Sequence, residues 1–411
     1  MIKRESRSIQ VCHISESSHT RNTMANSDPL RTILAVTNLL AITLVHFDKR
    51  TAKYRHAKNR HLIIFINVTF ITILSILYQW YVLSSIKSRV ELYGVIFGML
   101  VIMDSETALA WSYVMVLNAI LKSKYILKSM NTILAVQSKI KSNPANDLKR
   151  RRIVLLLRVW MFLSVFYYFV FITGLQIFSS KWTRTWVRIG VDMIFATCGV
   201  LSDLYVIMFD TFLLTVKMDL AMIKHRMKKC SKEADDLTLL MESYFEAMAL
   251  INLLGKAFTL PILFAIFSTF FEGTTQLYQV FVYTNLELGS LIKEVASFGV
   301  WLWPQLTKLC ITTKLAGSVS DEANEIALCT RHFDDCSMQN TKVTRQINKF
   351  LLKNLHQKKK FSAYGFFDIN NSVIYTVFSS IVTYLVILIQ FKQLENDFTN
   401  QNGGGNSTNS T

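Results

Sequence analysis

The chain has 411 residues with a formal net charge of +17, and 51% of its residues are hydrophobic. Its 4 prolines and 14 glycines are too few for a turn-rich β architecture, and its long apolar runs do not fit the short alternating strands of a membrane barrel. A large positive charge is compatible with nucleic-acid binding or with basic loops on the inner side of a membrane, and the apolar runs favour the membrane. We therefore expect an all-α, polytopic membrane protein that binds no nucleic acid.

The first 60 residues are polar and basic apart from one apolar run at residues 30–47. No apolar signal core precedes this run, so membrane insertion depends on a later span. The run is short and contains Arg31, Asn38 and His46, which predicts an interfacial or re-entrant helix on the inner face, with an eighth span as the alternative. Residues 1–60 are therefore expected to be a cytoplasmic segment.

Seven later runs have the length of about 20 mostly apolar residues that a membrane helix needs. They cover residues 61–83, 93–117, 153–175, 186–216, 256–281, 291–311 and 369–391. Pro261 and Pro304 should kink the fifth and sixth of these helices. Residues 217–248 lack proline and glycine and mix charges at helical spacing. We therefore expect the first six membrane helices, within residues 61–311, to carry long helical extensions into the cytoplasm.

Lysine and arginine are distributed unevenly between the two sides of this topology. Most of them fall in residues 1–60, 118–152, 217–255 and 312–368. The positive-inside rule then places the N-terminus inside and the C-terminus outside. Residues 392–411 would form an extracellular tail, in which Asn406 and Asn409 begin two glycosylation sequons. A low-complexity tail with sequons by chance is the alternative.

No pattern in the chain predicts an enzyme or a metal site. The six cysteines show neither metal-ligand spacing nor a CxxC pair, and we expect free thiols. The motifs GxSxG, HExxH, Walker A and GxGxxG are all absent. No catalytic residue, cofactor or metal is therefore expected, and the basic clusters are predicted to contact membrane lipids.

The fourth predicted span contains three aspartates, although charges inside a membrane are costly. At helical spacing Asp192, Asp203 and Asp210 lie on one stripe, which should face protein or water. Arg188 lies one turn before Asp192, and Arg158 lies at the depth of Asp210. We interpret these charges as structural ion pairs, and we keep Asp192 as a candidate ligand-binding residue as well.

Further polar and aromatic positions fall in the other spans. The second span contains Asp104 and Glu106, of which one would line a wet cavity unless they only mark a break against a polar neighbour. Aromatic side chains concentrate in the outer halves of the spans, where they form interfacial belts, helix cores or ligand pockets. The candidate pocket residues among them are Tyr167, Tyr168, Phe171, Phe271, Tyr278 and Trp301.

The last span, residues 369–391, is uncharged, and its polar positions include Ser379, Ser380, Thr383 and Gln390. If copies of it surrounded an axis, a narrow apolar lining could gate ions by dewetting. By composition alone it could equally be an ordinary membrane anchor.

This last span also carries a motif. Thr383-Tyr384, five hydrophobic residues, and then Gln390-Phe391 resemble the signature of the insect gustatory-receptor family, and residues 361–371 resemble the family's approach to its last span. The resemblance implies a ligand-gated, non-selective cation channel that detects a small-molecule tastant in the plasma membrane of a sensory neuron. It also implies a homotetramer or heterotetramer.

The resemblance further implies roles for individual segments. Residues 312–368 would belong to a cytoplasmic anchor, residues 369–391 would line the pore, and the ligand pocket would lie in the outer half of each subunit. Thr383 and Tyr384 are motif residues, and Gln390 and Phe391 would lie near the outer gate. Val386 and Ile389 are added as pore-lining candidates from helical spacing.

The resemblance also bears on the ligand and on the alternatives. Sugar-receptor members tend to have an acidic residue where this chain has Leu385, so a bitter or aversive ligand is favoured over a sugar. An insect odorant receptor subunit remains an alternative. A G-protein-coupled receptor would need an external N-terminus, and a secondary transporter would show internal repeats.

Overall fold

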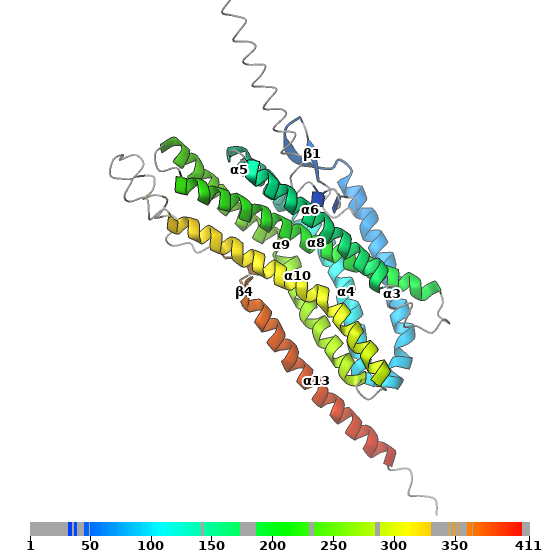
Figure 1. Ribbon diagram of the computed structural model, residues 1–411. Coiled ribbons are helices and arrows are strands. Elements are labelled where there is room, and N and C mark those ends of the chain that lie inside the picture. Colours follow the sequence, from blue (N-terminus) through cyan, green and yellow to red (C-terminus); the bar gives the residue numbers. More distant parts are fainter. Residues whose placement is uncertain are drawn as a thin grey trace, which may run out of the picture.

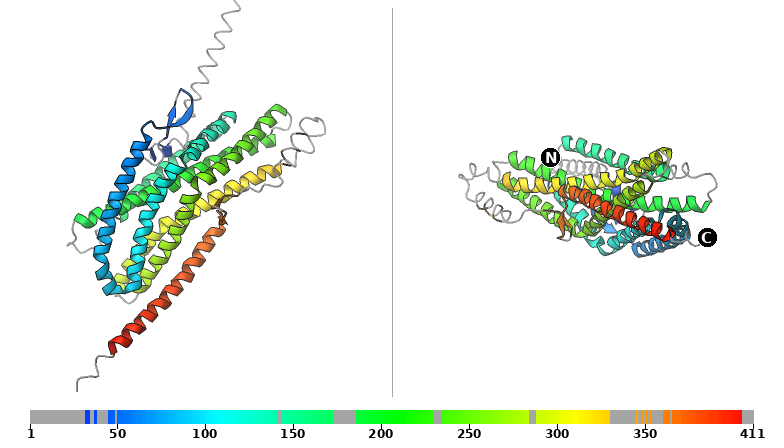
Figure 2. Two further views of the ribbon diagram at one scale, coloured as in Figure 1. Left: turned by 180° about the vertical axis from the view of Figure 1, so that it is seen from behind. Right: turned by 90° about the horizontal axis from the view of Figure 1, so that it is seen from below.

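The computed structural model describes residues 32–34, 37–38, 45–48, 50–140, 144–172, 186–229, 234–283, 288–329, 345, 348, 350, 352, 360–363 and 365–404. Most of these residues are helical (Figure 1). Long helices form one elongated bundle, and the last helix, α13 (Ser372–Gly404), lies along one side of it (Figure 2). The fold is therefore mainly helical, as the apolar runs predicted.

The long helices follow the predicted spans in order. They are α3 (Arg60–Tyr93), α4 (Val95–Leu121), α6 (Pro144–Phe166) with the π-helix η1 (Tyr167–Ile172), α8 (Trp186–Lys229), α9 (Ala234–Tyr283), α10 (Leu288–Cys329) and α13. Both α9 and α10 continue through their prolines, Pro261 and Pro304.

Five stretches among the described residues are long and apolar enough to cross a membrane. They are Arg60–Ser84, Val95–Leu121, Arg150–Phe169, Leu237–Val282 and Ser372–Phe398. Only 11% of the most apolar window of α3 and 17% of that of α13 are buried within the chain. Aromatic side chains such as Phe65 and Phe162, each 68% exposed, add to this uncovered apolar surface. Such a surface needs lipid or other protein against it.

Helix α8 occupies the centre of the bundle. Leu204, Tyr205, Phe212 and Val216 are fully buried along it. The Phe258 ring of α9 packs against Tyr205 with ring centroids 5.6 Å apart, and against Phe212 at the same distance. Helices α8 and α10 cover the fourth and sixth predicted spans, and both carry charged residues in their middle parts.

The helices extend beyond the apolar spans at one end of the bundle. There α5 (Ser123–Lys139) packs against α9 through a buried face that includes Ile126, Met130 and Ile133, which recur every three or four residues. Lys139 of α5 lies 2.9 Å from Glu246 of α9. The hydrogen bond with Glu246 raises the pKa of Lys139.

Short hairpins interrupt the helical pattern in two places. The strand β1 (Val45–Asp48) pairs antiparallel with β2 (Lys53–His56), with Val45 opposite His56. Helical residues occur at 32–34 and 37–38, but residues 45–47 form a strand, so the helix predicted for 30–47 does not reach its expected end. The Asn38 side chain accepts a hydrogen bond from the Val45 N–H at 2.9 Å, which helps to set this strand in place.

The second hairpin leads into α13. Its strands are β3 (Ser362–Ala363) and β4 (Phe367–Asp368), joined by a turn with Gly365 at φ +82°. The Asn370 side chain then accepts the Ser372 N–H at 2.9 Å, as an N-terminal cap does. Helix α13 continues to Gly404, beyond the predicted boundary at 391, so part of the predicted tail 392–411 is helical.

Candidate functional site

Helix α13 packs on α9 with one face only. The apolar side chains of that face are buried or half-buried, as at Val377, Ile381 and Leu385. A Cβ at Gly273 of α9 would lie 2.8 Å from Ile381 Cδ1, so a larger residue there would displace the end of the Ile381 side chain. The Tyr384 ring is 53% exposed but still packs edge-on against Phe270, with centroids 5.3 Å apart.

The face of α13 opposite to α9 carries a polar stripe. Thr376, Ser379, Thr383, Val386 and Gln390 are all exposed and follow one another every three or four residues, so they lie along one side of the helix. We call these five residues the α13 stripe. Thr376 donates a hydrogen bond to the carbonyl oxygen of Ser372 at 3.1 Å, and Thr383 donates to that of Ser379 at 2.9 Å.

The other predicted pore residues lie beside this stripe. Phe391 is 55% exposed on a neighbouring side of the helix. Ile389 is half-buried and lies between the stripe and the packed face. The spacing of Val386 therefore places it in the stripe, whereas that of Ile389 does not.

A polar contact attaches the C-terminal part of α13 to the turn between α3 and α4. Lys392 Nζ donates to the carbonyl oxygen of Tyr93 at 3.0 Å and lies 2.9 Å from Glu395 Oε2. Glu395 Oε1 accepts the Val95 N–H at 2.8 Å. We call Tyr93, Gly94, Val95, Lys392 and Glu395 the α13 clamp. Lys392 and Glu395 therefore form an ion pair within the helix and both bind the turn between α3 and α4.

Gly94 is the tightest point of the clamp. Its φ is +96° and its ψ 170°, a combination that essentially only glycine adopts. A Cβ at this position would lie 2.6 Å from Lys392 Nζ and 2.7 Å from Glu395 Oε2. The turn therefore needs glycine both for its backbone and for the approach of the two charged groups.

A cluster of charges is buried in the middle of the bundle. Lys308 Nζ of α10 lies 2.5 Å from Asp203 Oδ1 of α8, and both side chains are at most 10% exposed. Asp203 Oδ2 accepts the Ser164 hydroxyl at 2.9 Å. Glu272 of α9 interacts electrostatically with Lys308, Asp203 and Asp104. Lys308 therefore lies near two carboxylates from two other helices, Asp203 of α8 and Glu272 of α9.

The partners of the predicted charged residues differ in part from expectation. Asp203 pairs with Lys308, which was not selected from the sequence. Asp210 is buried and accepts a hydrogen bond from the Thr312 hydroxyl at 3.2 Å. Arg158 is exposed on α6, so the predicted pair between Arg158 and Asp210 does not form. The side chains of Arg188 and Asp192 lie outside the described residues.

A second buried ion pair was missed. Arg150 Nη2 of α6 lies 2.9 Å from Asp219 Oδ1 of α8, with side chains 11% and 2% exposed. Gln137 of α5 also donates to Asp219, at 3.4 Å. Arg150 belongs to a basic run that suggests a membrane surface, yet its own side chain is buried against α8.

Of the two predicted acidic residues of α4, Glu106 is exposed and accepts a hydrogen bond from Gln79 of α3 at 3.1 Å.

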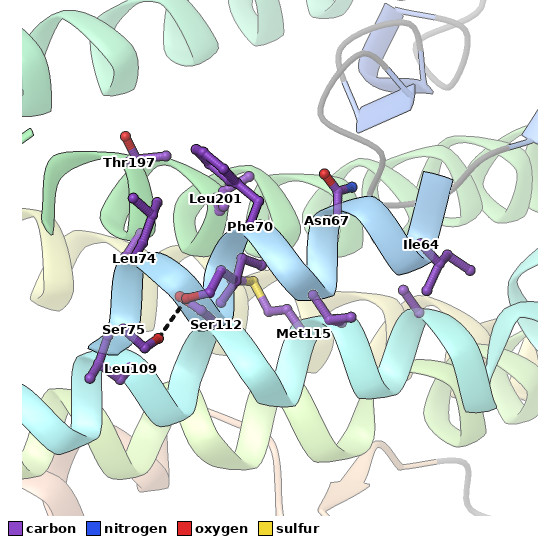
Figure 3. A pocket seen from close by; sticks show the side chains of 14 residues that line it. Ile64, Asn67, Phe70, Leu74, Ser75, Leu109, Ser112, Met115, Thr197 and Leu201 are labelled. Carbon is purple, nitrogen blue, oxygen red and sulfur yellow. Dashed lines mark hydrogen bonds between the residues drawn. The ribbon is translucent and has the colours of Figure 1, made fainter. Parts of the chain in front are cut away.

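An apolar pocket of about 210 Å³ lies between α3, α4 and α8 (Figure 3). Its walls are mainly aliphatic, and they include Ile64, Phe70 and Leu74 of α3. The polar residues of the lining are Asn67, Ser75, Ser112, Thr197 and Cys198. A mostly apolar lining with a few polar groups is typical of small-molecule pockets.

The predicted ligand residues do not line this pocket. Tyr168 is buried and lies against Gly199 of α8, beside the charge cluster, and Tyr167 packs next to it. Tyr278 is fully buried in a small core with Phe97 and Leu100 of α4, against which Phe271 also packs. The side chains of Phe171, Asp192 and Trp301, and the residues Asn406 and Asn409, lie outside the described part of the chain.

Comparisons with known proteins agree with this fold. The sequence model of the family described as 7tm Chemosensory receptor matches residues 30–395. Gustatory receptor 68a of Drosophila melanogaster is 32% identical over 215 residues, which are 47% of this chain and 53% of that protein. Gustatory and pheromone receptor 39a, isoform B, of the same species is 37% identical over 117 residues, which are 28% of this chain and 30% of that protein. The chain thus spans about half the length, or less, of these relatives.

A solved structure shows the same arrangement of helices. The insect olfactory receptor OR5 from Machilis hrabei in complex with eugenol superposes with a TM-score of 0.59 at 10% identity, covering 90% of this chain and 98% of that one. At this identity the similarity establishes the fold.

The bundle, its uncovered apolar helices and this similarity define a polytopic helical membrane protein with the fold of insect chemoreceptors. Because the family model covers residues 30–395, the chain belongs to the 7tm chemosensory receptor family. The resemblance to gustatory receptors that the Thr383-Tyr384 and Gln390-Phe391 motif suggested is confirmed by the Drosophila relatives.

Proposed function

We propose that the protein is a gustatory receptor that acts as a ligand-gated, non-selective cation channel, in which α13 lines a central pore formed by four subunits. The observation that carries this proposal is the α13 stripe. Three hydroxyls and one amide follow one side of an apolar helix, and they lie opposite the face that packs on α9. Polar side chains inside a membrane normally face protein or a water-filled path.

The outward side of α3 provides a comparison for the stripe. Many of its exposed residues are large and apolar, as at Leu62, Phe65, Ile66 and Ile73. That composition suits contact with lipid tails. The polar composition of the α13 stripe suits an aqueous pore instead, with the apolar Val386 between Thr383 and Gln390 as a point where the pore could dewet.

The proposal includes seven spans, with the N-terminus inside and the C-terminus outside the plasma membrane of a sensory neuron. The basic residues near the inner ends of the helices and the membership of the family support this topology. The four subunits would be identical or include other gustatory receptors. Leu385, in place of an acidic residue, favours a bitter or aversive tastant over a sugar.

An odorant receptor subunit is the remaining alternative, because the fold of OR5 is shared. The relatives named above are gustatory receptors, which favours the gustatory function.

Orientation can be tested with epitopes on intact cells. An epitope at the C-terminus should be accessible to antibody without permeabilisation, whereas an epitope at the N-terminus should require it. The opposite pattern would contradict the proposed topology and would fit a G-protein-coupled receptor.

The channel function can be tested by expressing the chain alone in cells and applying a tastant panel without added G protein. We expect a ligand-evoked cation current. Gln390→Ala should shift the half-maximal ligand concentration or the basal current by about fivefold, or about 1 kcal/mol, without abolishing surface expression. Phe378→Leu, an exposed position of α13 away from the stripe, is the matched control and should leave gating unchanged. Surface-expressed receptor that gives no current with any partner receptor would contradict the proposal.

A further inference from the structure

The apolar pocket between α3, α4 and α8 lies far from the turn that joins α3 to α4. It reaches from Ser75 to Ile64 on α3 and from Leu109 to Ala119 on α4. Leu109, at the near end of the pocket, is 14 residues beyond Val95, and at about 1.5 Å per residue this is a depth of about 21 Å along α4. The pocket is therefore separate from the α13 clamp.

We propose that this pocket binds a small, mainly apolar molecule that carries a hydroxyl or carbonyl group and reaches the site from the bilayer. The volume sets the size of the molecule. An apolar cavity of about 150 Å³ takes up benzene, and this pocket measures about 210 Å³. It therefore suits a compound with a skeleton of about ten carbon atoms.

The polar atoms of the pocket set the functional group. Ser112 is 1% exposed, and its hydroxyl oxygen has no geometrically good hydrogen bond in the described structure. It interacts with the thiol of Cys198, which is a weak hydrogen-bonding partner. A buried hydroxyl without a strong partner costs free energy, which a ligand hydroxyl or carbonyl could recover. The hydroxyls of Ser75 and Thr197 already donate to backbone carbonyl oxygens of their own helices, and the half-buried amide of Asn67 offers a further polar contact on α3.

The route into the pocket follows from the position of α3. Phe70 lines the pocket but is 55% exposed, so its ring separates the pocket from the outside of the bundle. The neighbouring outward residues Ile66 and Ile73 are 56% and 52% exposed and apolar. An apolar molecule dissolved in the bilayer would meet this wall directly, and rotation of one phenylalanine side chain would admit it.

Photolabelling can test the site without any measurement of current. The probe is decanol carrying a diazirine near its hydroxyl end, applied to membranes that contain the intact receptor, and mass spectrometry locates the labelled residues. We expect labels on α3, α4 and α8 at the pocket residues, with competition by unlabelled decanol. Labelling spread evenly over the exposed faces of α3 and α6, without competition, would overturn the proposal and show partition into lipid only.

Two variants and one control sharpen this test. Ala119→Phe fills the pocket and should remove most of the competed label, whereas Leu117→Phe, which is 48% exposed on the same helix, should leave it intact. Ser112→Ala should weaken competition by decanol about fivefold and leave competition by decane unchanged, because only the hydroxyl contact is lost. Equal effects on both competitors would contradict the role of Ser112.

The inference deepens the proposed function by giving the class of ligand for one pocket, but the two can fail separately. Competed labelling at the pocket in a receptor that conducts no ions would support the site and reject the channel. A ligand-evoked current that survives Ala119→Phe, together with loss of the label, would show that the activating ligand binds elsewhere.

Discussion

Lys308→Met should remove most of the receptor from the cell surface. The substitution deletes the cation of the buried cluster and leaves Asp203 and Glu272 beside each other in the bundle without it. Removing one partner of a buried ion pair costs about 3–5 kcal/mol, a large fraction of the stability of a typical domain. Surface biotinylation and the melting temperature of the detergent-solubilised protein measure the effect.

Two control variants show whether the loss of expression comes from the unpaired buried charge. Lys314→Met changes an exposed lysine of the same helix that has no ion pair among the described residues, and it should leave surface expression unchanged. The double variant Asp203→Asn with Lys308→Met removes both charges and should recover a substantial part of the expression that the single variant loses. Equal losses in the single and double variants would show that the pair itself contributes little.

Gly94→Ala should weaken the coupling between ligand binding and the pore. The backbone conformation of Gly94 costs another residue about 1–3 kcal/mol, and the added Cβ would collide with the charged ends of Lys392 and Glu395. The C-terminal part of α13 would then lose its attachment to the turn between α3 and α4. We expect the half-maximal ligand concentration to rise about tenfold, because coupling free energies are about 1–3 kcal/mol.

The clamp can also be tested from its other side. Glu395→Leu removes the acceptor of the Val95 N–H and the partner of Lys392, and it should shift the ligand response in the same direction as Gly94→Ala. Asp397→Asn changes a neighbouring exposed carboxylate of α13 and should have no effect. Glu395→Gln keeps an acceptor oxygen and should have an intermediate effect. A normal ligand response of Glu395→Leu at normal surface expression would show that the clamp has no role in gating.

The positions of the helices were predictable because each needs an apolar run of about 20 residues, and such runs are visible directly in the sequence. The residue at which α13 ends could not be predicted in this way. Lys392 and Glu395 look like the start of an aqueous tail, but in the structure they pair with each other and bind the turn at Tyr93 and Val95. That arrangement depends on contacts between residues about 300 positions apart, which a local pattern cannot reveal.

The charged site was predictable in part for a similar reason. The spacing of seven residues between Asp203 and Asp210 places both on one side of α8, and both are buried there. Their partners lie on other helices, and helical periodicity does not say which helices are neighbours. Lys308 did carry a signal, since it is a single lysine near the end of the sixth apolar run. The sequence around Arg150 was misleading, because its basic neighbours suggest a membrane surface while its own partner is the buried Asp219.

The apolar pocket had no signal in the sequence. Ser112 and Cys198 are ordinary small residues within apolar helices, and only the packing of α3, α4 and α8 brings them together. Aromatic residues drew attention to the outer halves of the spans, but Tyr278 and Phe271 fill a core between α4, α9 and α13.

Accessibility of the α13 stripe to a charged thiol reagent tests the central claim most directly. Cysteine is placed singly at Thr383, Val386 and Gln390, and at Phe378 for comparison, and a membrane-impermeant cationic methanethiosulfonate is applied from outside during a ligand-evoked current. A water-filled conduction path along this side of the helix predicts a rapid block at the three stripe positions and no block at Phe378. Stripe cysteines that react only with a lipid-soluble maleimide, while current continues under the charged reagent, would show that this side of α13 faces the bilayer.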